Sequence, residues 1–509
     1  MPRVTTLKKK QNEIIGEMSH KDFSFIGRMK KKFPQCEIYL VGGAVRDLIL
    51  SRPTKDFDFV VRGVGAKNLE KFLDGEGDTD LVGRHFGVFK FLPKGRSVEP
   101  FDIALPRTEH SLDEGGYRDF DVQSDPSLKI EDDLSRRDFT VNAIAYRLIA
   151  LGRNIAIREV VDPWNGKDDI KKKIIRTVGD SDERFREDYS RLLRGLRFAI
   201  QLGFEIEPGA FAAIGALIPK INDVKNNIRI VPTEIIAREF LKSFAADPVR
   251  ALDLWDKAGA IGALMPELLE MKGCVQPSNF HSEGDVWTHT RLALSLLKSK
   301  EYKRQFGSES PSAETILGVL FHDIGKPRTK QTPQEHGTDR IRFNNHDVVG
   351  SVMADGICER LTLSAPAEFS IDAERIANLA RHHLITVHGQ VKNIRNNTIE
   401  KYFFSPSFPG EALQRVIFCD SSATIPEVGK PDLKHYFDLR KRIAKLKKLS
   451  AERPILPPPV VNGDEIMKWL KLKPGPEVGR LIRDLREEQL SGKIKTKAQA
   501  RSFLKKHKI

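Results

Sequence analysis

The sequence predicts an α+β protein: a mixed sheet with helices comes first, and a long, mostly helical remainder follows. Two observations support this fold class. Short apolar runs with the length of strands occur before residue 165, at 38–41, 57–61, 86–92 and 97–104. After Pro163-Trp164-Asn165-Gly166 the apolar residues follow helical spacing instead, through 185–201, 209–217 and 233–244.

Composition limits the function classes. A chain of 509 residues is too long for a single core, and about three or four units are expected at ~100–200 residues each. Its net charge of +14 makes a polyanionic partner plausible. No apolar run approaches the ~18 residues that span a bilayer, and the basic N-terminus lacks the apolar stretch of a secretory signal. The four scattered cysteines predict buried thiols in a reducing cytoplasm rather than a disulfide framework.

A glycine pair and two carboxylates lie close together near the N-terminus. An apolar strand runs into Gly42-Gly43, a short helix carrying Arg46 follows, and the next strand carries Asp56 and Asp58. Because successive side chains of a strand alternate between faces, both aspartates point the same way and can share a Mg²⁺ ion. Glycines let a phosphate chain approach the backbone. The segment therefore predicts a site for a nucleoside triphosphate, although a tight turn and surface carboxylates would also explain it.

The segment Tyr39-Leu40-Val41-Gly42-Gly43-Ala44-Val45-Arg46-Asp47, closed by Lys55-Asp56-Phe57-Asp58, resembles the first motif of class II tRNA nucleotidyltransferases and bacterial poly(A) polymerases. These enzymes share a polymerase-β-like head. The resemblance implies that Asp56 and Asp58 hold two Mg²⁺ ions for in-line attack on the α-phosphate, with pyrophosphate leaving. It also implies that Gly42, Gly43 and Arg46 cradle the triphosphate or the sugar.

A second run reads Leu134-Ser135-Arg136-Arg137-Asp138-Phe139-Thr140-Val141-Asn142-Ala143. Adjacent guanidiniums suit phosphate and ribose contacts because their donors are planar and always charged, and a salt-bridged helix start is the structural alternative. The run is similar, nearly letter for letter, to the R-R-D-F-T-[IV]-N-A box of the same family. The resemblance implies that Arg136 and Arg137 assist in binding the incoming nucleotide.

Asp102 is a third candidate carboxylate. It lies in a strand-like run where related polymerase heads place one, and it could activate the RNA 3′-hydroxyl as a general base. A surface aspartate at a strand end is the alternative explanation.

A third motif places charged residues at every third position, which predicts a polar stripe along one helix: Asp188, Arg191, Arg194 and Arg197. Ion pairing along the helix would explain the stripe structurally. Cytosine and adenine, however, each offer an amine donor beside a ring-nitrogen acceptor. A carboxylate only accepts and a guanidinium only donates, so an Asp188–Arg191 pair would complement C and A and mismatch U and G. The stripe resembles the nucleotide-selecting element of CCA-adding enzymes, with Arg194 and Arg197 as further nucleotide or phosphate contacts.

Histidines gather later in the chain, in the order His289, His322-Asp323, His346, His382-His383, with Asp420 beyond them. One histidine alone is usually structural, but imidazoles and carboxylates on successive helices can converge on Mn, Fe, Ni or Zn. The set resembles an HD-superfamily phosphohydrolase domain, whose core pattern matches His289, His322, Asp323 and Asp420. His346 and either His382 or His383 would complete a two-metal version, and His382 is taken here as the ligand. Such a centre could hydrolyse a 2′,3′-cyclic phosphate or a phosphomonoester.

These resemblances predict a Mg²⁺-dependent, template-independent enzyme that adds or repairs the CCA end of tRNA in the cytoplasm from CTP and ATP, without a membrane partner. Three alternatives stay open: a poly(A) polymerase, an enzyme adding only CC or only A, and an HD phosphohydrolase with an RNA-binding N-terminal part. Residues 83–88 lack the tandem arginine of the bacterial poly(A) branch, which favours tRNA repair.

The predicted division of the chain has five parts: a basic lead-in at 1–36, the nucleotidyltransferase head at 37–165, a helical neck at 166–280, the HD domain at 281–425 and a helical tail at 426–509.

Overall fold

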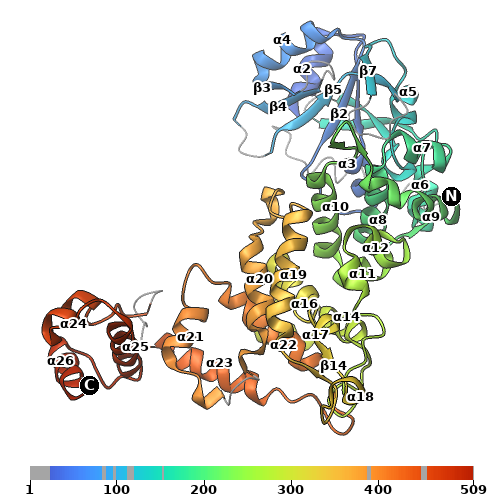
Figure 1. Cartoon of the computed structure of the whole chain (residues 1–509). Coiled ribbons are helices and arrows are strands. Elements are labelled where there is room, and N and C mark those ends of the chain that lie inside the picture. The colour runs from blue at the N-terminus through green and yellow to red at the C-terminus, as the bar shows by residue number, and fades with distance from the viewer. Residues whose placement is uncertain are drawn as a thin grey trace. The chain divides into compact units, whose positions relative to one another are not determined.

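The computed structural model describes residues 23–82, 88–95, 99–111, 120–151, 154–386, 391–448 and 456–507. The chain divides into two compact units, one of residues 1–247 with 253–263 and one of residues 248–252 with 264–509. A mixed sheet with helices precedes an all-helical part with a few two-residue strands, which confirms the predicted fold class (Figure 1). Within the described ranges no helix combines the length and the apolar character needed to cross a membrane.

In the described part of the first unit, seven strands form one sheet in the order β3-β4-β5-β2-β1-β8-β9. Only β2 and β5 run parallel among these neighbours. The strands of this sheet are β1 (Glu37–Val41), β2 (Asp58–Arg62), β3 (Gly77–Val82), β4 (Val88–Pro93), β5 (Phe101–Ala104), β8 (Ala145–Leu151) and β9 (Asn154–Val161). A separate antiparallel pair is formed by β6 (Arg107–Ser111) and β7 (Phe120–Ser124).

The register of the sheet brings the predicted head residues to one edge. Val41, the last residue of β1, pairs with Asp58, the first residue of β2. Asp58 in turn pairs with Asp102 on β5. The turn at Gly42 therefore begins beside the strand that carries one of the two motif aspartates.

Helices cover the sheet and continue the first unit beyond it (Figure 1). They are α2 (Ser24–Lys32), α3 (Gly43–Ile49), α4 (Ala66–Glu76), α5 (Ile130–Ser135), α6 (Gly166–Lys172), α7 (Ser181–Glu187), α8 (Ser190–Leu202), α9 (Pro208–Leu217) and α10 (Thr233–Ala246), with 3₁₀ turns η1 (Thr140–Asn142) and η2 (Ile218–Asn222). The division between the two units falls within α11 (Pro248–Lys257) and α12 (Ala260–Leu264), because residues 248–252 and 264 belong to the second unit. Short strand pairs are β10 (Ile174–Ile175) with β11 (Glu205–Ile206) and β12 (Val224–Lys225) with β13 (Ile228–Arg229).

Helix α2 lies within the predicted lead-in but belongs to the core of the head. Phe25 is buried against Phe59 and Phe91, and Phe23, just before the helix, stacks on Phe101. Fully burying such a side chain stabilises a fold by ~1.5–3 kcal/mol, so this segment holds the sheet together. The predicted boundary at 37 thus cuts through the packed head.

The second unit is helical in its described residues, apart from one strand pair, β14 (Lys330–Gln331) with β15 (Arg342–Phe343). Its helices are α13 (Pro266–Leu269), α14 (Val286–Leu296), α15 (Lys300–Phe306), α16 (Ala313–Phe321), α17 (Lys326–Thr329), α18 (Pro333–His336), α19 (His346–Arg360), α20 (Ala373–His382), α21 (Asn396–Phe403), α22 (Gly410–Ala423), α23 (Lys434–Lys447), α24 (Gly463–Leu470), α25 (Pro476–Leu490) and α26 (Lys497–His507). The 3₁₀ turns are η3 (Ala367–Phe369), η4 (His383–Thr386) and η5 (Val391–Asn393). A small apolar core of its own joins α24, α25 and α26.

Gly325, just before α17, marks a close approach of two segments. A Cβ at this position would overlap the carbonyl oxygen of His346 and lie 2.5 Å from the backbone nitrogen of Gly350. Both partners are backbone atoms of α19 and cannot swing away. The position therefore accepts only glycine, and it keeps the segment of His322 and Asp323 against α19.

We expect Gly325→Ala to lower the free energy of unfolding of the second unit by about 2–3 kcal/mol, because the added methyl group forces two backbones apart. Gly356→Ala is the matched control. Gly356 is exposed on α19 with open space around it, and alanine there should be neutral or stabilise the helix by up to ~1 kcal/mol. Urea unfolding followed by circular dichroism measures both, and equal stability of the two variants would contradict the packing described.

Candidate active site and candidate metal centre

The first unit contains a pocket of about 550 Å³ that gathers residues from all three sequence motifs. Every residue predicted to contact the nucleotide lines it, together with Asp56 and Asp58. The described lining consists of Gly42, Gly43, Arg46, Asp56, Asp58, Arg107, Arg136, Arg137, Asp138, Asn142, Asp188, Arg191, Arg194, Arg197, Phe198 and Lys242. Eight of these side chains are cations and four are carboxylates, so the pocket favours a polyanionic ligand.

The turn at Gly42 brings the backbone close to two charged groups of the pocket. Gly42 has φ +72°, in the left-handed region that favours glycine. A Cβ there would lie 2.9 Å from Nη1 of Arg137 and 3.3 Å from Oδ2 of Asp58. Any side chain would therefore separate the backbone, the arginine and the carboxylate that meet at this point.

The carboxylates of Asp56 and Asp58 lie in each other's field. Burial and the neighbouring Asp56 raise the pKa of Asp58 to about 6. Burial, followed by Asp102 and Glu99, also raises the pKa of Asp56. Carboxylates held together against their own repulsion are a donor set that a hard divalent cation would relieve, so these residues fit the predicted Mg²⁺.

Asp102 lies beside Asp58 in the register of the sheet, but it is absent from the described lining of the pocket. Its Oδ1 accepts a hydrogen bond of 3.1 Å from Nζ of Lys90 on β4. It therefore adds negative charge near the two motif aspartates, from a more exposed position.

The arginines of the pocket are held by carboxylate and amide oxygens behind them. Asp133 on α5 is fully buried and pairs with Nη2 of Arg136 at 2.8 Å and with Nη2 of Arg137 at 3.3 Å. Arg46 donates from Nη1 to Oδ1 of Asn142 at 2.8 Å. The two adjacent arginines of the second motif thus share one anchor, which explains their tandem arrangement.

Two further arginines of the pocket, both on α8, each pair with a carboxylate. Nη2 of Arg194 lies 2.6 Å from Oδ2 of Asp138, and Nε of Arg197 lies 2.5 Å from Oε2 of Glu239 on α10. Burial alone would raise the pKa of Asp138, but Arg194 outweighs it and lowers the pKa to about 2. The carboxylate of Asp138, beside Arg194, is therefore ionised at neutral pH.

Asp188 does not belong to the helix of the arginine stripe, contrary to the prediction. Helix α7 ends at Glu187 and α8 begins at Ser190, and Asp188 between them has an extended backbone. Its Oδ1 accepts a hydrogen bond from the backbone N–H of Ser190 at 2.8 Å, a turn-type bond two residues ahead that accompanies the break between the two helices. The stripe on α8 consists of Arg191, Arg194 and Arg197.

Asp188 and Arg191 nevertheless face the same pocket as a loose pair. Oδ2 of Asp188 lies 3.9 Å from Nε of Arg191, whereas Nη1 of Arg191 lies 2.5 Å from Oε2 of Glu187. Burial, only partly offset by Ser190 and Arg191, raises the pKa of Asp188. The carboxylate of Asp188, which accepts hydrogen bonds, and the guanidinium of Arg191, which donates them, therefore lie side by side without forming a close ion pair with each other.

Sequence reasoning did not assign five further residues of the lining. One of them is Asp138, which pairs with Arg194. Asn142 anchors Arg46, and Arg107 comes from β6. Phe198 on α8 also reaches the pocket, where the guanidinium of Arg197 lies 4.0 Å from its ring centroid. Lys242 comes from α10, where an isolated lysine on a helix gives no sequence signal of a site.

The second unit brings the predicted histidines of the HD set together around Asp323. On one side Nε2 of His289 lies 3.3 Å from Nε2 of His322 and 3.2 Å from Oδ1 of Asp420. Nε2 of His322 also lies 3.4 Å from Oδ2 of Asp323.

On the other side of Asp323, its Oδ1 lies 3.4 Å from Nε2 of His346 and 3.6 Å from Nε2 of His383. The two imidazole nitrogens are 3.3 Å apart. Ligand atoms around one metal ion with bonds of about 2.1 Å are separated by about 3.0–3.4 Å, so both halves fit a transition-metal ion with Asp323 between them.

His383 occupies the position predicted for His382, and this corrects the ligand set. Nδ1 of His383 bonds the carbonyl of Ala380 at 2.7 Å, which aims Nε2 at Asp323. His382, at the end of α20, instead packs on the rings of Tyr402 and Phe408. Burial and then Arg381 lower its pKa to about 4, so it is neutral in this aromatic cluster.

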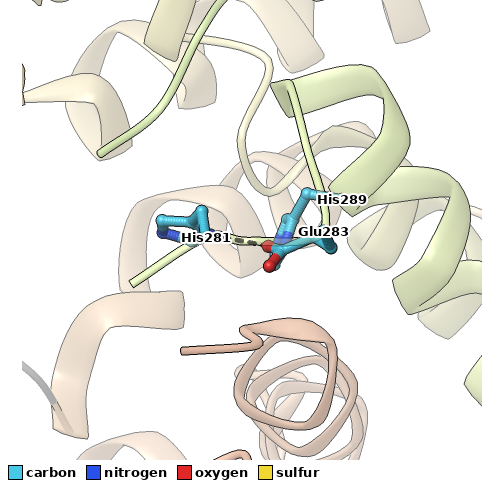
Figure 2. Close-up of side chains that lie close together, drawn as sticks. All are labelled: His281, Glu283 and His289. Atoms are coloured by element: carbon cyan, nitrogen blue, oxygen red, sulfur yellow. Dashed lines mark hydrogen bonds and ion pairs between the residues drawn. The ribbon is translucent and has the colours of Figure 1, made fainter. Parts of the chain in front are cut away.

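Two residues near this centre had no sequence assignment. Nζ of Lys326 lies 2.6 Å from Oδ2 of Asp323, so a metal ion bound at this oxygen would compete with the lysine for it. Oε1 of Glu283 lies 2.8 Å from Nδ1 of His289 and 2.7 Å from Nδ1 of His281 (Figure 2). Burial opposes ionisation of Glu283, but the hydrogen bonds from His281 and His289 outweigh it and lower the pKa to about 2.

Two domain families match the chain. Residues 38–176 match the poly(A) polymerase head domain, and residues 286–407 match the HD domain. Both families are metal-dependent, and the described residues of the second unit include side-chain groups that could hold a metal ion.

Known proteins resemble the whole chain. The A-adding tRNA nucleotidyltransferase of Deinococcus radiodurans is 29% identical over 92% of this chain and 94% of its own length. The multifunctional CCA protein of Paracidovorax citrulli is 33% identical over 68% of this chain and 73% of its own length. The crystal structure of the Bacillus stearothermophilus CCA-adding enzyme in complex with CTP has the same fold, with a TM-score of 0.60, 21% identity and 96% of each chain covered.

With 33% identity to the Paracidovorax citrulli protein over more than two thirds of both chains, the chain belongs to the class II tRNA nucleotidyltransferase and poly(A) polymerase family, as its motifs predict.

Proposed function

We propose that this chain is a template-independent nucleotidyltransferase that adds or repairs the CCA end of tRNA from CTP and ATP, with release of pyrophosphate. The observation that carries the proposal is the pocket of the first unit, which joins the aspartate pair, the glycine turn and the Asp188–Arg191 pair. Relatives named for CCA addition and for A addition to tRNA support it.

Each group of the pocket has a role in this proposal. Mg²⁺ held by Asp56 and Asp58 would supply the Lewis acid for attack of the RNA 3′-hydroxyl on the α-phosphate. The turn at Gly42 and Gly43 admits the phosphates close to the backbone. The anchored guanidiniums of Arg46, Arg136 and Arg137 hold the phosphate chain and the ribose, because their donors are fixed before the ligand arrives. Asp102, next to Asp58 on β5, is the third carboxylate and accepts the hydroxyl proton.

We assign base selection to Asp188 and Arg191. Asp188 accepts from the exocyclic amine of cytosine or adenine, and Arg191 donates to the adjacent ring nitrogen. Uracil and guanine would place like groups against each other and leave buried polar atoms unpaired, which costs ~1–3 kcal/mol for each such atom. Arg194 and Arg197, fixed by Asp138 and Glu239, complete the wall beside Phe198.

Addition of only the final A is the second candidate. The A-adding enzyme of Deinococcus radiodurans aligns over 92% of this chain, whereas the Paracidovorax citrulli CCA protein aligns over 68%. Transcripts of one tRNA that lack the last three, two or one nucleotides separate the candidates when each is offered single labelled nucleotides. A full CCA enzyme extends all three, and an A-adding enzyme extends only the last. Extension of an unstructured RNA with ATP alone would instead indicate a poly(A) polymerase.

For the second unit we propose a metal-dependent phosphohydrolase centre built from His289, His322, Asp323, Asp420, His346 and His383, with Mn, Fe, Ni or Zn as the metal. The supporting observation is the fit of the ligand-atom spacing to two metal positions that share Asp323. A 2′,3′-cyclic phosphate or a phosphomonoester is the proposed substrate class. We also propose that the protein acts in the cytoplasm. The five-part division of the chain is proposed as well, with α2 added to the head.

Asp56→Asn and Asp58→Asn should each reduce nucleotide incorporation into tRNA by about 10³-fold or more, because several kcal/mol of transition-state charge stabilisation are lost with the metal. Asp80→Asn, on the exposed surface of β3, is the matched control and should incorporate nucleotides normally. Single-turnover incorporation of labelled CTP and ATP measures the effect. Wild-type rates in either motif variant would refute the role of the pair.

Asp188→Asn should weaken base selection rather than abolish catalysis, since an amide both donates and accepts. We expect the ratio of kcat/KM for CTP over UTP to fall by about 10–100-fold, the equivalent of ~1–3 kcal/mol of lost discrimination. The control is Asp182→Asn, which removes a carboxylate from the exposed surface of α7. An unchanged ratio in Asp188→Asn would remove the pair from base selection.

His322→Ala should eliminate metal-dependent phosphoester hydrolysis while incorporation of nucleotides into tRNA continues at the normal rate. The reason is that His322 contributes only to the centre of the second unit, and nucleotide transfer needs only the pocket of the first. His336→Ala, a substitution of an exposed histidine on α18, serves as the control. Loss of both activities in His322→Ala, with normal thermal stability, would contradict two separate centres.

A further inference from the structure

The four imidazoles of the candidate metal centre are not oriented in the same way. Nδ1 of His322, His346 and His383 each bonds the main-chain carbonyl three residues earlier, at 2.7 Å. Nδ1 of His289 has no such partner and lies 2.8 Å from Oε1 of Glu283 instead (Figure 2). One ligand of the centre therefore depends on a side chain for its orientation.

A carboxylate at this position fixes which nitrogen of His289 is free. An ionised carboxylate accepts hydrogen bonds only, so Nδ1 must carry the proton. Nε2 then presents its lone pair toward His322 and Asp420, where a metal ion would bind. The negative charge also makes the imidazole a more basic ligand than a carbonyl partner would.

Glu283 also connects two ligand-bearing helices. Its side chain is buried, and Oε2 accepts a hydrogen bond of 3.0 Å from the backbone N–H of Ile425, just beyond the end of α22. Helix α22 carries Asp420, and α14 carries His289. The neighbouring Ser282 N–H donates to the carbonyl of Ile425 at 2.8 Å and reinforces the same connection.

His281 holds the carboxylate from the other side. Its Nδ1 lies 2.7 Å from the same Oε1, so two imidazoles converge on one oxygen (Figure 2). The three side chains are close enough to be considered a metal site of their own. A cation there would have to displace the Nδ1 proton of His289, which the hydrogen bond to Glu283 requires. Glu283 and His281 therefore orient the imidazole of His289, and these three side chains do not form a further metal site.

We propose that Glu283 is a positioning residue of the metal centre in the second unit. It fixes the tautomer of His289 and ties the ends of α14 and α22 so that His289 and Asp420 stay within reach of one ion. The proposal rests on the metal centre proposed for the second unit and is independent of nucleotide transfer in the first.

Cobalt binding to the full-length protein tests this role. The protein is stripped of metal, the head carboxylates are saturated with Mg²⁺, and Co²⁺ is titrated while its d–d absorption is recorded. We expect Glu283→Gln to bind Co²⁺ about 10–100-fold more weakly, with a shifted absorption band, because the charge behind His289 is lost. Glu283→Asp keeps a carboxylate and should recover part of the affinity.

Glu270→Gln is the matched control. Glu270 pairs with Arg328 on the surface of the same unit and is not one of the residues assigned to the centre. It should bind Co²⁺ as the wild type does, and all variants should incorporate nucleotides into tRNA normally. Loss of incorporation in the wild type would refute the proposed function of the head without affecting this test.

Wild-type affinity and an unchanged band in Glu283→Gln would overturn the proposal, and so would a wild type that binds no Co²⁺ in the second unit. If Glu283→Gln does not fold, a measurement on the wild-type protein still tests the proposal. In protein with ¹⁵N-labelled histidine, Zn²⁺ should shift Nε2 of His289 while Nδ1 keeps its proton. A zinc-induced shift of Nδ1 with loss of its proton would overturn the assignment.

Discussion

The head pocket depends on carboxylates that hold its arginines in place before any ligand arrives. A free arginine side chain carries ~2 kcal/mol of rotamer entropy, and an unpaired buried charge costs several kcal/mol more. Asp133 removes both costs for Arg136 and Arg137, and Asp138 does so for Arg194. Since these anchors come from α5 and from the turn beside η1, the cationic wall is built by the fold itself. The pocket can therefore be rich in positive charge without being disordered.

The candidate metal centre of the second unit also needs side chains that are held in place. Imidazole can bind metal through either nitrogen, so a centre with four histidines must fix four tautomers. Three are fixed by the main-chain carbonyl three residues earlier, which needs no further side chain. This carbonyl lies in the last turn of a helix for His322 and His383, and at the end of β15 for His346. Asp323 then faces His322 through Oδ2 and both His346 and His383 through Oδ1. One carboxylate can thus serve two ions because its two oxygens point into different halves.

Much of the fold and the head site followed from local sequence patterns, and the differences arose where distant segments or a single turn decided the outcome. Strands β1, β2, β4 and β5 were recognised from short apolar runs, whereas β8 and β9 were not, because consecutive apolar residues such as 148–151 suit a helix as well as a strand. The three-residue period around Asp188 predicted one helix, but its carboxylate bonds the backbone N–H of Ser190 in a turn, and a new helix begins there. Adjacent residues of a helix differ by about 100° in direction, so a His-His pair alone could not say which one faces the centre. The run 83–87, used to argue against a poly(A) polymerase, lies outside the described residues.

In the proposed function, the Asp188–Arg191 pair would explain a rejection of U and G, but it would treat C and A alike. Both bases present an amine beside a ring-nitrogen acceptor, so the hydrogen bonds are equivalent and the discrimination between them from this pair is close to zero. The order in which C and A are added must then come from the space around the base, because a purine needs more room than a pyrimidine. In a pocket whose arginines are anchored, that space changes only when the RNA end or the backbone moves. Full CCA addition and addition of A alone are therefore compatible with the same selecting pair, and the difference between such relatives has to lie in what shapes the cavity around it.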